Sequence, residues 1–144
     1  MKIPILLYLT IITSISLLGT TLTTSSANRK LNIKLEHTLQ LSNNGVGNEW
    51  TNYLSINKKV IKKDETLTLE LIKRAPLRIE AHSIEEDDKY PDFGENHMDF
   101  TYSDLIAVEG SSRFEMDVEV MENGGENAGN LAKWKFIFLV SKGE

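Results

Sequence analysis

The chain contains no cysteine. This absence excludes a thiol nucleophile, a thiolate metal site, a lipid-modified N-terminal cysteine and a disulfide-linked partner. The chain also contains no Asn-X-Ser/Thr acceptor for N-glycosylation. A small domain without disulfides must rely on core packing, a bound metal or assembly for its stability.

Motifs for catalysis are missing as well. Gly110-Ser111-Ser112 lacks the flanking residues of a nucleophile elbow, and Gly124-Gly125 lacks the lysine and following helix of a phosphate loop. The three histidines lie far apart and outside any HExxH spacing: His37, His82 and His97. Because no nucleophile–base constellation is present, we expect the protein not to be an enzyme.

The N-terminus has the pattern of an export signal. Lys2 precedes an apolar run that extends to Leu18, and small polar residues follow it. Ser25-Ser26-Ala27 supplies small side chains for signal peptidase, which predicts cleavage after Ala27 and a secreted, extracellular protein. A retained membrane anchor is the alternative, although polar residues interrupt the ~20 apolar residues that a spanning helix needs. We therefore expect a signal peptide at 1–27 and one domain at 28–144.

Acidic residues dominate the expected mature domain. Lys2 is the one basic residue of the first 27, so positions 28–144 carry 15 basic and 21 acidic residues, a net charge of −6. A surface of this sign repels phosphate backbones, which disfavours nucleic-acid binding. It permits the binding of cations or of cationic partners.

Apolar residues alternate with polar ones along most of the mature chain, which is the pattern of half-buried strands. In the first strand the predicted inward residues are Leu31, Ile33, Leu35, His37, Leu39 and Leu41, with His37 as a hydrogen-bonded core histidine. Strands are expected near 31–41, 50–56, 60–61, 66–72, 77–83, 98–102, 114–120 and 131–140, with one helical turn at 103–105. This pattern predicts an all-β fold, an eight-stranded antiparallel β-sandwich of C2-like or immunoglobulin-like type.

Three loops follow strands one, five and seven, and strand count places them at one end of such a sandwich: 42–49, 85–95 and 122–130. If the short strand at 60–61 were absent, the first loop would move to the other end. The end carries many carboxylates, and we expect a metal site formed by Glu86, Asp87, Asp88 and Asp92. Additional candidate ligands are Asn43, Asn44, Glu122 and Glu126. Calcium suits such oxygen donors, although the spacing differs from an EF-hand; a solvated acidic turn is the alternative.

The aromatic residues of the last strand, Trp134, Phe136 and Phe138, share one face and are expected in the core. Trp50 lies beside the first Gly/Asn-rich loop. It either caps the core or is an exposed contact residue for a partner.

The middle of the chain resembles a C2 domain. Segments 76–81 and 85–95 read PLRIEA and EEDDKYPDFGE, which is similar to the sixth strand and third loop of that family. Segment 47–56, GNEWTNYLSI, is similar to the end of its first loop and the following strand. Three strands after the acidic loop resemble the circularly permuted form of the fold. The resemblance implies a calcium-tuned surface for membrane, protein or glycan contact, without catalysis.

These observations favour a secreted, non-catalytic binding module with an acidic, calcium-binding loop end. Its partner is an unidentified protein, glycan or membrane surface. Two alternatives remain open at the level of sequence. One is a secreted toxin, effector or inhibitor that acts on a protein of another cell. The other is a structural surface or matrix component that assembles through strand edges.

Overall fold

The computed structural model describes residues 29–73, 75–87 and 91–144. The expected signal peptide at 1–27 lies outside these residues, as does the candidate ligand Asp88. Within the described ranges, no helix has the length and apolar character needed to cross a membrane.

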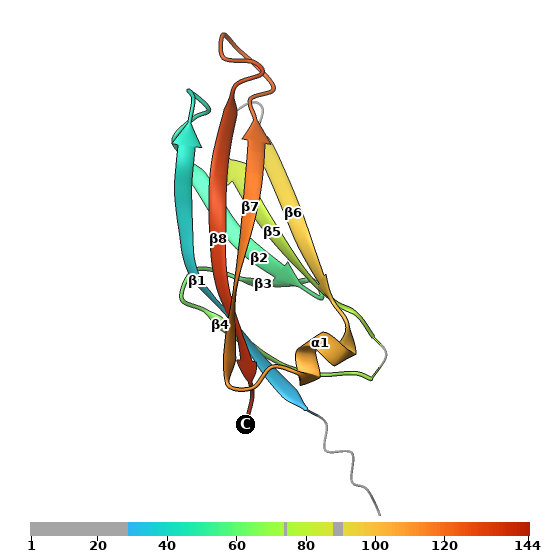
Figure 1. Ribbon diagram of the computed structural model, residues 1–144. Coiled ribbons are helices and arrows are strands. Elements are labelled where there is room, and N and C mark those ends of the chain that lie inside the picture. Colours follow the sequence, from blue (N-terminus) through green and yellow to red (C-terminus); the bar gives the residue numbers. More distant parts are fainter. Residues whose placement is uncertain (1–28, 74, 88–90) are drawn as a thin grey trace, which may run out of the picture.

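Eight strands form two antiparallel sheets that pack face to face (Figure 1). One sheet has the order β4-β1-β8-β7 and consists of β1 (Lys30–Asn43), β4 (Thr66–Glu70), β7 (Ser111–Met121) and β8 (Leu131–Lys142). The other has the order β3-β2-β5-β6 and consists of β2 (Trp50–Ile56), β3 (Lys59–Ile61), β5 (Leu77–Glu85) and β6 (Asp92–Phe100). The expected all-β, eight-stranded antiparallel sandwich is confirmed.

The core lies between the two sheets. Phe136 and Phe138 of β8 are fully buried there, and Trp134 packs against the same cluster, as the sequence predicts. The first half of β1 contributes Leu31, Ile33 and Leu35, which are also fully buried. Burial of an aliphatic or aromatic side chain contributes about 1.5–3 kcal/mol, so these alternating residues hold the two sheets together without a disulfide.

The second half of β1 departs from the predicted pattern. The pairing of β1 with β8 shifts register between Leu35 and His37 and again between Gln40 and Ser42. A shift of one residue turns the following side chains to the opposite face. His37 is therefore exposed, and Leu39 and Leu41 are 46% and 48% exposed. The expectation that these three side chains point inward is wrong.

A single helical turn lies at the end of the sandwich away from the three long loops (Figure 1). This turn, α1 (Tyr102–Ile106), is the one expected around 103–105. Thr101 is its N-cap, and the Thr101 and Asp104 side chains form a reciprocal capping box. Leu105 is the buried residue of the turn and anchors it to the core.

The free edges of β6 and β7 meet at one side of the sandwich. Asn96 Nδ2 of β6 donates to the Asp117 carbonyl of β7 over 2.8 Å. A Cβ atom on Gly94 would lie 2.2 Å from the Glu119 carbonyl oxygen, which is a steric clash. Glycine, which has no Cβ atom, avoids this clash. Gly94 thus lets the two sheets approach each other beside the loop end.

Candidate functional site

Three connections lie at one end of the molecule: 44–49 between β1 and β2, the described residues 86–87 and 91 between β5 and β6, and 122–130 between β7 and β8 (Figure 1). Asn130 Nδ2 donates to the Asn44 carbonyl over 2.6 Å. The Glu86 amide donates to the Glu49 carbonyl over 2.7 Å. The short strand β3 exists, so the strand count that predicted this convergence is confirmed.

The acidic loop is shorter than the predicted 85–95, because both flanking strands extend into it. Glu85 is the last residue of β5 and Asp92 is the first residue of β6. Glu85 continues the inward register of Leu77, Ile79, Ala81 and Ser83. It pairs directly with Asp92 across the two strands. Both carboxylates therefore point into the sandwich, and we call them the inner carboxylate pair.

The inner carboxylate pair is buried and incompletely hydrogen-bonded. Glu85 is 2% exposed and Asp92 is 0% exposed. Asp92 Oδ1 accepts the Asn123 amide at 2.9 Å. Asp92 Oδ2 and Glu85 Oε2 are buried without a hydrogen-bond partner among the described residues. A buried carboxylate oxygen without a partner is costly, and two like charges directly opposite each other repel. A proton or a cation at this position would remove both costs.

Neighbouring acids add to the negative charge. Burial, followed by the negative charge of Asp87, raises the pKa of the Glu85 carboxyl above its ordinary value, and Asp92 and Glu122 contribute further. Burial, followed by the charge of Asp92, raises the pKa of the Glu122 carboxyl. The electrostatic group is therefore Glu85, Asp87, Asp92 and Glu122, drawn from two of the three loops and the strands beside them.

Glu85 also lines a polar hollow of about 250 Å³, which we call the acidic pocket. Its lining residues are Asn48, Glu49, Glu85, Glu86 and Asp87. The Thr51 hydroxyl holds the Glu86 carboxylate at the edge of the sheet. A Cβ atom on Gly47 would lie 1.6 Å from Glu85 Oε1, and its φ angle of +31° also favours glycine, so the first loop closes tightly over Glu85.

The predicted ligands fall into separate groups. Glu86 and Asp87 line the acidic pocket, and Asp92 belongs to the inner carboxylate pair. Asn43 Nδ2 donates to the Gly47 carbonyl over 2.7 Å and so closes its own loop. Glu126 is exposed on the last loop. Among the residues that the structure describes, no three histidine, aspartate or glutamate side chains are grouped closely enough to hold a metal ion by themselves.

Two tryptophans lie behind the acidic end. Trp50 pairs with Glu85 across β2 and β5, and its ring centroid lies 5.3 Å from that of Trp134 on the opposite sheet. Both rings are half-buried and pack against the core. Their Nε1 atoms are buried without a hydrogen-bond partner in the described part of the chain. Trp50 thus caps the core; a contact with a partner stays a prediction.

Sequence reasoning did not select Glu85 as a ligand and did not anticipate the polar interior. The polar interior includes Ser83, which is buried and whose hydroxyl donates to Asn52 Oδ1 between β5 and β2. The signal for Glu85 was present, because the alternation of β5 continues inward through Ser83 to Glu85. The sequence alone did not show that the strand extends that far into the acidic segment.

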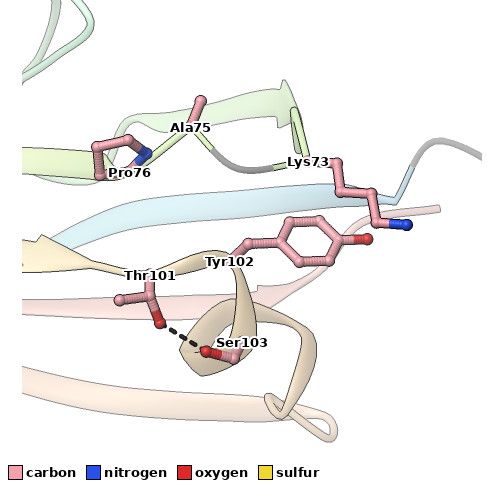
Figure 2. A pocket seen from close by; sticks show the side chains of 6 residues that line it. All are labelled: Lys73, Ala75, Pro76, Thr101, Tyr102 and Ser103. Atoms are coloured by element: carbon pink, nitrogen blue, oxygen red, sulfur yellow. Dashed lines mark hydrogen bonds between the residues drawn. The ribbon is translucent and has the colours of Figure 1, made fainter.

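A second hollow lies at the opposite end, between α1 and the segment before β5 (Figure 2). It has a volume of about 390 Å³ and a largely apolar lining of Lys73, Ala75, Pro76, Thr101, Tyr102 and Ser103. The Thr101 and Ser103 hydroxyls form a hydrogen bond of 2.8 Å at its margin. Among the residues that the structure describes, Lys73 is the charged residue of its lining, which distinguishes it from the acidic pocket.

No protein-family model matches the chain, and no curated protein sequence matches it. The fold defines the protein as an all-β sandwich with two four-stranded antiparallel sheets. The interpretation of its acidic end rests on the residues described above.

Proposed function

We propose that the protein is a secreted, non-catalytic binding module that holds calcium at its acidic loop end. The observation that carries this proposal is the inner carboxylate pair. Glu85 and Asp92 each bury an oxygen without a hydrogen-bond partner among the described residues, at the place where three loops meet. A divalent cation between them would offset the repulsion and the lost hydration together.

Calcium suits this environment better than other divalent cations. It accepts six to eight oxygen ligands in flexible geometry, including backbone carbonyls and water. Magnesium demands stricter octahedral geometry, and zinc prefers nitrogen and sulfur ligands. Because the described side chains do not form a group of three ligands, the coordination we propose is completed by loop carbonyls and water. Asp87 and Glu122, whose charges act on Glu85, are the next carboxylates available.

The resemblance to a C2 domain supports the same position. Its two segments correspond to the β1–β2 loop with β2 and to β5 with the β5–β6 loop, and these loops meet at the acidic end. Three strands follow the acidic loop, as in the permuted form of that fold. Export rests on the pattern of residues 1–27, and the absence of catalysis rests on the lack of a nucleophile–base motif.

Thermal unfolding with calcium or with EDTA tests the proposal. A ligand that binds only the folded state raises its stability, by about 2.7 kcal/mol when the ligand is at 100 times its dissociation constant. We expect calcium to raise the melting temperature of the wild-type protein, produced from its full-length sequence. The Asp92→Asn variant should lose most of this rise. Glu109→Gln, which removes one exposed carboxylate beyond α1, should retain it. Identical wild-type curves in calcium and EDTA would contradict the proposal.

A further inference from the structure

The carboxylates of the acidic pocket differ from the carboxylates that form ion pairs on the sheet faces. On the sheet faces, acids pair with bases: Asp99 with Arg78 at 2.7 Å, Glu115 with Lys135 at 2.8 Å. The acidic pocket contains four carboxylates and one amide. None of these four carboxylates forms an ion pair with a lysine, arginine or histidine of the described chain. A cation that enters from outside the described residues would neutralise these carboxylates.

Glu85 supplies an independent reason for a ligand in this pocket. Its side chain is almost fully buried, lines the hollow, and keeps Oε2 without a hydrogen-bond partner among the described residues. An exposed acidic turn would leave its carboxylates hydrated, at little cost. A buried one gains free energy when a charged donor reaches it.

The size of the pocket selects among cations. Its volume of about 250 Å³ exceeds the ~30 Å³ share of one water molecule several times over. A bare ion would leave most of this space to solvent. A guanidinium group is planar, carries five N–H donors, and is more weakly hydrated than an ammonium group. It can bond two carboxylates at once, which suits a site with acids on several sides.

The described part of the rim is acidic, which favours a cationic partner. Within the described residues of the three loops (44–49, 86–87, 91 and 122–130) there is no lysine, arginine or histidine, whereas Glu122 and Glu126 add further negative charge. An anionic membrane surface or a nucleic acid would be repelled, and a cationic protein segment would be attracted.

We propose that the acidic pocket is the docking site for an arginine side chain of a partner protein, and that calcium competes with this arginine for Glu85. The inference rests on the proposed function for the identity of the binding end. It adds the chemical nature of the partner and the control of partner binding by calcium. In the absence of calcium the guanidinium bonds Glu85 together with Glu49, Glu86 or Asp87 at the mouth. Bound calcium occupies the Glu85 oxygen and releases the partner.

The test uses a short, terminally blocked peptide with one arginine, and a matched peptide with citrulline, which keeps the shape and loses the charge. In EDTA, we expect the arginine peptide to shift the backbone amide signals of residues 47–49 and 85–87 in an NMR titration. The Glu85→Gln variant should weaken binding at least about tenfold, and the exposed Asp87→Asn variant should weaken it as well. Glu109→Gln, which makes an equal change in net charge, should leave the affinity unchanged. Calcium should displace the arginine peptide.

Equal binding of the citrulline peptide, or an unchanged affinity in both Glu85→Gln and Asp87→Asn, would overturn the docking site. Binding of calcium together with anionic phospholipid vesicles, without binding of the arginine peptide, would also overturn it in favour of a membrane partner. The two proposals fail separately. Arginine binding in a protein whose unfolding ignores calcium contradicts the calcium function alone. Calcium binding without arginine binding contradicts only the docking site.

Discussion

Glu85 and Asp92 face each other across β5 and β6, at the point where the two strands run into their connecting loop. Each places one carboxylate oxygen in the interior without a hydrogen-bond partner among the described residues. Cross-strand pairs of like charge are destabilising, and burial increases the repulsion because solvent no longer screens it. The stability of the acidic end therefore depends on the group that neutralises Glu85 and Asp92.

Replacement of one charge of the inner carboxylate pair should stabilise the protein in the absence of metal. We expect Glu85→Gln to raise the free energy of unfolding in EDTA by about 1 kcal/mol, because it removes a buried charge and the repulsion with Asp92. Chemical denaturation in urea measures this difference. Glu109→Gln should be neutral, since Glu109 is exposed. A clear loss of stability in Glu85→Gln would show that the glutamate charge is compensated in the folded protein.

Stability of the metal-free protein should rise as the pH falls from about 7 towards the ordinary carboxyl pKa. Burial and the charge of Asp87 raise the pKa of Glu85, and burial and the charge of Asp92 raise the pKa of Glu122. In this window the folded protein binds more protons than the unfolded chain, so stability falls with increasing pH. Melting temperatures in EDTA at several pH values measure the effect. Glu85→Gln should flatten the profile, and an unchanged profile would contradict the assignment.

Calcium should stabilise the protein less at about pH 5 than at about pH 7, because protons and calcium compete for the same raised-pKa carboxyls. The measurement is the difference in melting temperature between calcium and EDTA at each pH. A stabilisation that is equal at both pH values would mean that calcium acts elsewhere on the protein.

Gly47→Ala should damage the acidic end. The new methyl group would lie 1.6 Å from Glu85 Oε1, and the φ angle of +31° at this position is strained for alanine. We expect a loss of about 1–3 kcal/mol in stability and a weaker response to calcium. Gly124→Ala is the matched control, since no atom lies within 4 Å of its added Cβ. Equal stability of the two variants would contradict the close approach of loop 44–49 to Glu85.

Gly94→Ala should separate β6 from β7. The methyl group would lie 2.2 Å from the Glu119 carbonyl oxygen, and a backbone atom cannot move aside as a flexible side chain can. We expect a loss of stability of about 1–3 kcal/mol and faster amide hydrogen exchange along β7. Exchange rates like those of the wild type would show that the two edges can part without cost.

The alternation of apolar residues was sufficient to predict the eight strands, the sandwich and the meeting of the three loops. The pattern failed in β1, where Leu39 and Leu41 continue the alternation but register shifts against β8 leave them exposed. Such shifts depend on pairing with β8, which is a long-range property that a local pattern does not contain. The alternation of apolar and polar residues also did not show where β5 ends and β6 begins in the acidic segment.

The sequence predicted the position of the acidic end but only part of its composition. The sequence indicated an acidic end with Asp87 and Asp92, and both lie there. It did not indicate that Glu85 is buried, because a glutamate at a strand end is usually solvated. It also gave weight to Asn43, whose side chain instead bonds the Gly47 carbonyl of its own loop. Such contacts depend on loop conformation rather than on residue type.

Calorimetric titration of calcium into the protein, in parallel with Asp92→Asn and Glu109→Gln, tests the central claim most directly. We expect wild-type protein and Glu109→Gln to bind calcium with the same affinity, and Asp92→Asn to bind it at least about tenfold more weakly. Absence of calcium binding by the wild-type protein, or equal binding by all three proteins, would contradict the account.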